Sequence, residues 1–459
     1  MQTERPLGLL EKYQVSKQLL RCYGCVTTTA VFRHSPRPDN NNIKQFYLNQ
    51  LHAPLTQLVE KHPQLSLVVS QSDESNAHFL RLNSFNLESI VTIKHFPFYD
   101  QNELSQLIGT ESDREFDLND HTIPPWHLTI GVDKERPDEC SMTLAAHHVI
   151  MDGKSFAQFW QDLKLGQQQG TQPDTYTIQG SKKELLGSYE NRGAPMPTAM
   201  DLVPLVGKSL AKKILPKKWA QDWLMATGCW AGDRPADQKE THDTKVRAMT
   251  VGGTAWRQIC ATCREHNVTP HAAIMAALVE AFTKVYPNTA VKTTTPVNCR
   301  SFAHVPPDEM GNFVGSFGYT WNSNDMAFWD RAKTYHRLLR ASKGEAAKEA
   351  GLLKYLNKYP DDYFKFWQDN WDYPMARSGG IELSDLGRVA VNSSSSDGWA
   401  LQSLYFCQSA QTFTTALGVN SISTEDSMYA TIGWQKNSVD EDKAEALCAL
   451  LQETLYRLI

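Results

Sequence analysis

The chain has 459 residues, a formal net charge of −5 and a hydrophobic content of 41%, including 12 Trp, 16 Tyr and 18 Phe. That length exceeds what one ordinary hydrophobic core accommodates, so we expect two or three structural units. The mildly acidic balance argues against a nucleic-acid-binding protein, because such proteins meet phosphates with clustered Lys and Arg.

The amino-terminal segment MQTERPLGLLEKYQ lacks the apolar run of a secretory signal, and no uninterrupted apolar stretch approaches membrane-spanning length. Nine cysteines, an odd number, are consistent with reduced thiols. Two pairs have C-x-x-C spacing, Cys22 with Cys25 and Cys260 with Cys263. These pairs are far apart in sequence, and zinc needs four converging ligands. We therefore expect a cytoplasmic protein with core thiols and no metal site.

Helical and strand patterns alternate along the first third of the chain. Apolar spacing and β-branched runs predict, in order, a helix over 7–20, a strand over 23–34, a helix from residue 43, and short strands over 65–69, 78–82 and 90–96. The second helix ends before His62-Pro63, because the residue that precedes a proline is driven out of the helical region.

The segment 141–153, SMTLAAHHVIMDG, begins as a strand and ends in two adjacent histidines, three apolar residues and an Asp-Gly pair. Neighbouring side chains of a strand point to opposite faces, so His147 and His148 cannot both face one cavity. Buried polar rings cost stability unless each finds a partner. We expect His148 to face a reaction channel while His147 packs behind it. Asp152 and Gly153 then turn the chain into a helix over 154–163.

Two other roles compete with catalysis for these histidines. A histidine on an apolar strand is often a satisfied core residue, but two in a row before Asp-Gly are harder to explain in that way. A metal site would need further ligands, and the turn breaks the helical spacing that would bring His148 and Asp152 together. We favour a general base over both.

A stretch of weak pattern from 167 to about 241 predicts a crossover linker, since so long a structureless loop is improbable inside one domain. We divide the chain into an amino-terminal lobe over 1–175, a linker over 176–241 and a carboxy-terminal lobe over 242–459. Within the linker, DLVPLVGKSLAKKILPKKWAQDWL mixes apolar residues with lysines. Such a cationic amphipathic helix is able to lie on a membrane or lipid-droplet surface, although a solvated helix is the favoured interpretation. Its lysines are Lys208, Lys212, Lys213, Lys217 and Lys218.

In the second lobe, the sequence pattern predicts a strand near 245, helices over 254–266 and 269–286, and a strand over 291–299. It then predicts helices over 328–342 and 345–359, strands over 400–407, 412–420 and 427–435, and a final helix over 441–456. Thr269 as N-cap and Pro270 at the first helical position mark one helix start. Each lobe therefore reads as helices over a mixed sheet.

The pattern H-H-x-x-x-D-G resembles the signature of the chloramphenicol-acetyltransferase-like superfamily, which includes peptide-synthetase condensation domains and plant and fungal acyltransferases. The segments EKHPQLSLVV and Phe116-Asp117-Leu118, the latter followed by Pro125-Trp126, also resemble family segments. The lead PLGLLEKYQ resembles fungal alcohol acetyltransferases in particular. The resemblance implies an α/β fold of two similar lobes with an active-site tunnel at their interface.

The resemblance also implies roles for further residues. In TPVNCRSF, Arg300 corresponds to an arginine that pairs with the motif aspartate. Asn312 in MGNFVG is a family-like position, and Ser384, Asp385 and Gly387 in SDLG resemble a segment near the channel. These last four residues are weaker candidates for substrate binding.

The chemistry of acyl transfer fits these residue types. A neutral imidazole can take the proton of an alcohol as the new bond forms, and the unperturbed pKa of histidine is about 6.5. His148 is our candidate base. Asp152 either orients His148 directly, as in a triad, or pairs with Arg300 to brace the loop. Gly153 would keep a Cβ out of the channel. No G-x-S-x-G elbow offers a covalent serine route.

We therefore predict an acyl-CoA-dependent O-acyltransferase that acts in a ternary complex, in particular an alcohol acetyltransferase, with a secondary metabolite as one candidate acceptor. One alternative is a condensation-type enzyme that takes its acyl group from a carrier protein and acylates an amine. Another is a catalytically inactive binding protein of the same fold. We expect acetyl-CoA or another acyl-CoA as co-substrate, no permanently bound cofactor and a monomer. The acceptor and the acyl length stay open.

Overall fold

A computed structural model describes residues 1–35, 42–166, 173–201, 228–235, 242–322, 326–391 and 398–459. The elements of the amino-terminal part are β1 (Gln2–Pro6), α1 (Leu9–Leu19), β2 (Val26–His34), α2 (Ile43–Lys61), β3 (Leu67–Ser70), β4 (His78–Arg81), β5 (Ser84–Asn86), β6 (Val91–His95), α3 (Gln101–Ser112), β7 (Trp126–Asp133), β8 (Arg136–Ala146), α4 (Gly153–Asp162) and β9 (Thr177–Gln179).

The elements of the carboxy-terminal part are β10 (Cys229–Trp230), β11 (Thr244–Val251), α7 (Gly253–Glu265), α8 (Pro270–Val285), β12 (Ala290–Asn298), β13 (Val314–Trp321), α9 (Phe328–Ala350), α10 (Asp361–Gln368), β14 (Ile381–Arg388), β15 (Trp399–Gln408), β16 (Leu417–Ser423), β17 (Met428–Gln435) and α11 (Glu441–Tyr456). The predicted N-cap Thr269, whose side chain accepts from the Ala272 N–H with Pro270 next to it, is confirmed.

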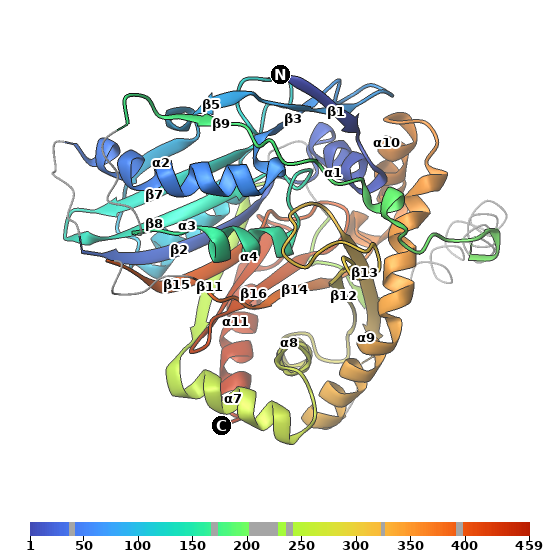
Figure 1. Ribbon diagram of the computed structural model, residues 1–459. Helices are drawn as coiled ribbons and strands as arrows, with labels where there is room; N and C mark the ends of the chain where they lie inside the picture. Colours follow the sequence, from blue (N-terminus) through green and yellow to red (C-terminus); the bar gives the residue numbers. More distant parts are fainter. Residues whose placement is uncertain (36–41, 167–172, 202–227, 236–241, 323–325, 392–397) are drawn as a thin grey trace.

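Figure 1 shows two mixed sheets. Each sheet contributes strands mainly to one of two hydrophobic cores. The first has the order β15-β2-β8-β7-β6, and the second has the order β10-β12-β14-β16-β17-β11 with β13 beside β12. Helices cover these sheets, and the interior strand β17 has no exposed residue, whereas β12 and β13 alternate between buried and less buried positions. The predicted α/β class with two acyltransferase-type lobes is confirmed.

One strand joins the first sheet from far along the chain. β15 pairs with β2 in antiparallel register from Trp399 opposite His34 to Gln408 opposite Val26. The segment 242–459 therefore supplies an edge strand to the sheet of the segment 1–175. In the segment 176–241, β9 pairs with β5 of the first part and β10 pairs with β12 of the second. The predicted amphipathic helix with its lysines lies outside the described residues.

Two local predictions were wrong. The helices expected over 328–342 and 345–359 are a single helix, α9, followed by a 3-10 turn at Gly351–Tyr355. A glycine inside a helix costs only about 1 kcal/mol, and burial of the following Ala346 and Ala347 offsets the cost of Gly344. The strand expected over 412–420 starts only at Leu417, because the N–H groups of Ala416 and Leu417 both donate to the Gly380 carbonyl.

A buried carboxylate helps to join the two halves. Asp113 follows α3, and its oxygens accept hydrogen bonds from the N–H and hydroxyl groups of Thr244 at the start of β11 and from the Ser409 hydroxyl. Burial raises the pKa of Asp113 to about 6, against the opposing effect of these donors. Among the described helices, none is long and apolar enough to cross a membrane.

The exchanged strand gives a prediction for stability. Trp399 is buried at the start of β15, with its ring centroid 4.7 Å from that of His34 and 5.9 Å from that of Phe32. We expect Trp399→Ala to lower the free energy of unfolding by about 3–5 kcal/mol through the cavity that it leaves. Urea denaturation measures this, with the exposed Trp371→Ala as matched control. Equal effects of the two changes would contradict the packing of β15 on β2.

Candidate active site

The two adjacent histidines follow directly after β8 and face different surroundings. The His147 N–H donates to the Pro125 carbonyl at 2.9 Å, which continues the pairing beyond the last strand residue, Ala146. The His147 ring is buried, and its Nδ1 accepts from the Val149 N–H at 2.9 Å. The His148 ring lies on the opposite side and lines a cavity. The alternation expected of a strand thus extends one step past its end.

That cavity has a volume of about 730 Å³ and is lined by both halves of the molecule. The first half contributes α1, His148 and the start of α4, and the second contributes β12, β13, β14, part of β15 and the segment after α9. Pockets of this size are typical of sites that hold a small-molecule ligand. The cavity is therefore large enough for an acceptor and the reacting end of a donor together.

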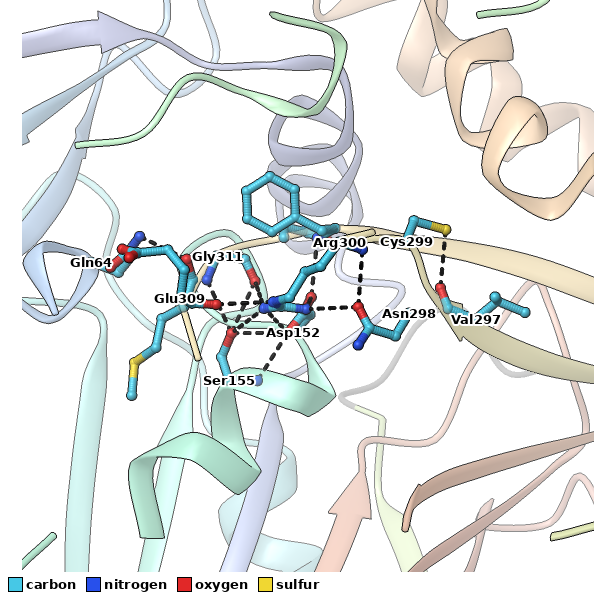
Figure 2. A network of polar contacts seen from close by, with 12 residues as sticks. Gln64, Asp152, Ser155, Val297, Asn298, Cys299, Arg300, Glu309 and Gly311 are labelled. Atoms are coloured by element: carbon cyan, nitrogen blue, oxygen red, sulfur yellow. Dashed lines mark hydrogen bonds and ion pairs between the residues drawn. The ribbon is translucent and has the colours of Figure 1, made fainter. Parts of the chain in front are cut away.

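Asp152 and Arg300 form a buried ion pair beside the cavity, shown at the centre of Figure 2. Arg300 Nη1 lies 2.8 Å from Asp152 Oδ2, and Nη2 lies 2.9 Å from Oδ1, so the contact is bidentate. Arg300 is 2% exposed and Asp152 is 3% exposed. Of the two roles that the sequence left open for Asp152, the geometry matches pairing with Arg300, because both carboxylate oxygens accept from the guanidinium.

The surroundings of the pair use almost every remaining donor and acceptor. Asp152 is the N-cap of α4 and accepts from the Ser155 N–H at 2.9 Å and from the Phe313 N–H at 3.0 Å. Arg300 Nε donates to the Glu309 carbonyl at 2.9 Å. The Ser155 hydroxyl lies 2.9 Å from Asp152 Oδ1 and accepts from Arg300 Nη2 at 3.1 Å (Figure 2). The pair is thus held from α4, β12 and the loop before β13.

Sequence reasoning missed Ser155. It stands three residues after Asp152, which is the spacing at which an N-cap side chain accepts from the helix backbone. The spacing therefore contained a signal for the cap, but the contacts of the Ser155 hydroxyl with Arg300 and Gly311 join segments about 150 residues apart.

Two further residues of the prediction fix the loop that carries His148. Asn312 Nδ2 donates to the His148 carbonyl at 3.2 Å, so Asn312 holds the backbone of the base. Gly153 lines the cavity, and a Cβ there would lie 2.6 Å from the Leu386 side chain. The absence of a side chain at Gly153 therefore lets β14 approach the start of α4.

The SDLG segment is split by the structure. Ser384 and Asp385 line the cavity with His148, whereas Gly387 lies behind them and donates its N–H to Asp385 Oδ1 at 3.0 Å. Asp385 also accepts from the Ser421 hydroxyl at 2.9 Å and lies 3.2 Å from His271 Nδ1. These contacts occupy Asp385 in the second sheet, so Ser384 is the freer of the two toward a ligand.

The electrostatics keep both histidine rings neutral at pH 7. Burial, reinforced by the positive charge of Lys17, lowers the pKa of His148 to about 4, against the opposing effect of Asp152. Burial and the neighbouring His148 lower the pKa of His147 to about 3. The pKa of Asp152 is lowered despite its burial, because Arg300 and the backbone donors stabilise the carboxylate. The His148 ring is therefore a proton acceptor that carries no charge at pH 7.

The two cysteine pairs are buried or partly buried and lie far apart in the sequence. Within the described ranges, no group of three or more His, Cys, Asp or Glu residues is placed to hold a metal ion. Burial raises the pKa values of Cys22 and Cys263 to about 12, so both stay protonated at neutral pH. Cys25 is buried and Cys260 is partly buried.

The two-lobed fold is shared with solved proteins of low sequence identity. A trichothecene 15-O-acetyltransferase from Fusarium sporotrichioides is similar with a TM-score of 0.63 and 11% identity, covering 99% of this chain and 95% of that one. A wax ester synthase/diacylglycerol acyltransferase from Marinobacter aquaeolei VT8 has a TM-score of 0.57 and 15% identity, with 99% and 98% covered.

The epimerization domain from the third module of tyrocidine synthetase B has a TM-score of 0.59 and 14% identity, covering 100% of this chain and 98% of that one. At such identities the likeness establishes the fold alone. The family model for alcohol acetyltransferases matches residues 6–455, so the chain belongs to that family and is an acyltransferase. No curated protein matches it.

The buried pair gives a second prediction. Asp152→Asn keeps an N-cap side chain but leaves Arg300 charged and unpaired, so we expect the free energy of unfolding to fall by about 3–5 kcal/mol. Arg300→Met should cost a similar amount, and the double variant should cost less than the sum. Urea denaturation of all three measures the coupling. Lys365→Met, in an exposed pair with Asp369, is the control and should cost less than about 1 kcal/mol.

Proposed function

We propose that the protein transfers an acetyl group from acetyl-CoA to an alcohol within a ternary complex, with His148 as general base. The observation that carries this proposal is the position of His148, a neutral imidazole on the wall of a cavity that both halves line. Membership of the alcohol acetyltransferase family supports the acyl-transfer chemistry.

The proposed step starts with the acceptor hydroxyl against the His148 ring. Nδ1 is buried and has no hydrogen-bond partner among the described residues, which leaves Nε2 to meet the substrate. Nε2 takes the hydroxyl proton as the oxygen attacks the thioester carbonyl, and a tetrahedral intermediate forms. The C–S bond then breaks, and the imidazolium returns the proton to the departing sulfur. The products are the ester and free CoA, so atoms and charge balance.

The ion pair supports this step through the loop that carries His148. Asp152 and Arg300 fix the start of α4, and Asn312 fixes the His148 carbonyl, so the ring has one position relative to the cavity. In this proposal Asp152 is a positioning residue. The sequence-based prediction had placed it with His148 as a catalytic residue. Holding the base in one geometry removes the entropy cost of finding it during the reaction.

Substitution of the histidines tests the assignment. We expect His148→Ala to lower kcat for acetyl transfer by about 10²–10⁴-fold, with little change in the urea midpoint, because its Nδ1 makes no internal hydrogen bond. His147→Ala should lower the free energy of unfolding by about 1–3 kcal/mol, since it leaves the Val149 N–H unpaired. Steady-state kinetics with acetyl-CoA and denaturation measure both. An inactive His147→Ala beside an active His148→Ala would overturn the assignment.

The pH profile tests the neutral base independently. A base acts in its unprotonated form, so a pKa of about 4 for His148 predicts that kcat/KM is constant from about pH 8 to pH 6. Below about pH 4 the rate should fall tenfold per pH unit as the ring becomes protonated. Circular dichroism at each pH separates this limb from unfolding. A midpoint near 6.5, the ordinary value for histidine, would contradict the proposed environment.

The donor and acceptor classes are tested by the same assay. An acyl group delivered only by a carrier protein, with an amine as acceptor, would identify a condensation-type enzyme instead. Neither hydrolysis nor transfer from acetyl-CoA to a panel of alcohols and amines would favour a binding protein of the same fold.

A further inference from the structure

Helix α1 contributes buried polar side chains to the cavity. Leu10, Gln14 and Lys17 recur on one face of α1 and line the cavity. Gln14 is 5% exposed and Lys17 is 8% exposed. A charged and an amide side chain buried to this extent are costly unless a partner satisfies them.

The Lys17 ammonium is surrounded by aromatic rings. Its Nζ lies 4.3 Å from the ring centroid of Tyr23, 5.3 Å from that of Tyr13 and 5.4 Å from that of Trp367. Cation–π contacts stabilise the charge but use none of the three N–H donors directionally. In the part of the chain that the structure describes, the ammonium forms no hydrogen bond and no ion pair. Its donors are therefore available to a ligand.

Unpartnered acceptors belong to the same cavity. Gln14 Oε1, Thr294 Oγ1 and Thr415 Oγ1 are buried with no hydrogen-bond partner among the described residues, and all three side chains line the cavity. Thr294 of β12 is the register partner of Glu382 on β14, so their side chains share the face toward the cavity. A polar ligand is the simplest partner for groups that otherwise have none.

Glu382 is an acidic residue of the same cavity lining. Glu382 Oε1 accepts from Gln408 Nε2 at 2.9 Å and from Gln411 Nε2 at 3.3 Å, and Gln408 Oε1 accepts from the Tyr23 hydroxyl. Burial raises the pKa of Glu382 and lowers the pKa of Lys17, and each group opposes the shift of the other. A ligand carboxylate would meet Lys17 favourably but be repelled by Glu382. A neutral oxygen function suits both.

We propose that the acceptor alcohol carries a second neutral oxygen function, a hydroxyl or a carbonyl, which Lys17 binds, and that Lys17 is a specificity-determining residue. A hydroxyl accepts from the ammonium through its oxygen and donates its own proton to Gln14 or Glu382. A simple alkanol would leave these buried groups unpaired. This inference rests on the proposed O-acyltransferase function, because it assigns the acceptor of that reaction.

The geometry allows one molecule to span the base and the ammonium. The Tyr23 ring centroid lies 6.4 Å from that of His148 and 4.3 Å from Lys17 Nζ. Both groups are therefore neighbours of the same tyrosine ring, which limits the distance between them. The reacting hydroxyl and the second oxygen are accordingly expected at a fixed spacing in the acceptor, which a homologous series of diols measures directly.

The test compares straight-chain α,ω-diols, from 1,4-butanediol to 1,10-decanediol, with the alkanols of equal length. Within a narrow range of chain lengths, kcat/KM with acetyl-CoA should be about 10–100-fold higher for the diol, because a site built to bind a polar group rejects analogues that lack it. Lys17→Met, which keeps the length of the side chain, should abolish that preference mainly through KM. The readout is the diol-to-alkanol ratio of kcat/KM within each variant, so a general change of rate on substitution of Lys17 does not affect it.

Lys12→Met is the matched control. Lys12 is on the same helix, with its Nζ 5.5 Å from the ring centroid of Tyr359, outside the cavity lining. It should retain the diol preference. Equal kcat/KM for diols and alkanols at every length, or a preference that survives Lys17→Met, would overturn the inference.

A binding measurement separates this inference from the proposed function. Saturation-transfer NMR with 1,8-octanediol and 1-octanol reports occupancy without turnover. A diol preference that disappears in Lys17→Met supports the polar site even if no acetyl transfer occurs, in which case only the proposed function fails. The inference about Lys17 would be overturned if the protein transferred acetyl from acetyl-CoA but preferred the diol neither in binding nor in kinetics. The proposed function would then still hold. A urea midpoint close to the wild type shows that Lys17→Met is folded.

Discussion

The contact on which the site depends is the buried, bidentate pair of Asp152 and Arg300, which joins the start of α4 to the end of β12. Two charges in a protein interior are stable only when their geometry and their remaining hydrogen bonds compensate the lost hydration. Here the compensation comes from Ser155, the Phe313 N–H and the Glu309 carbonyl. Because these partners come from both halves, the loop that carries His148 is positioned by the whole molecule.

The pairing with Arg300 explains how the charged Asp152 can lie so close in sequence to His148, a neutral base. The carboxylate of Asp152 is fully engaged with Arg300, so its effect on the pKa of His148 is smaller than that of burial. The lining of the same cavity contains a second acidic and basic residue, Glu382 and Lys17, which form no ion pair with each other. A substrate bound there would be oriented by its oxygen atoms.

The sequence predicted what local chemistry determines. The orientation of His147 and His148 follows from strand alternation, the start at Pro270 follows from capping, and the Asp-Gly turn marks the beginning of α4. Arg300 and Asn312 were reached only through a family resemblance, because nothing near them in sequence indicates a partner about 150 residues away. The aromatic surroundings of Lys17 were not predicted, since Tyr23 and Trp367 lie outside the helix that carries Lys17, and Trp367 is about 350 residues away in the sequence. The continuity of α9 was missed because tertiary burial outweighs the preference of one glycine.

The placement of β15 also has a consequence for how the chain is made. During synthesis, β2 leaves the ribosome hundreds of residues before the strand that covers its free edge, so the first sheet waits with an unpaired row of N–H and C=O groups. Neither half is then a self-sufficient folding unit. Expressing 1–175 and 242–459 as two separate proteins would leave the β2 edge of the first sheet without β15.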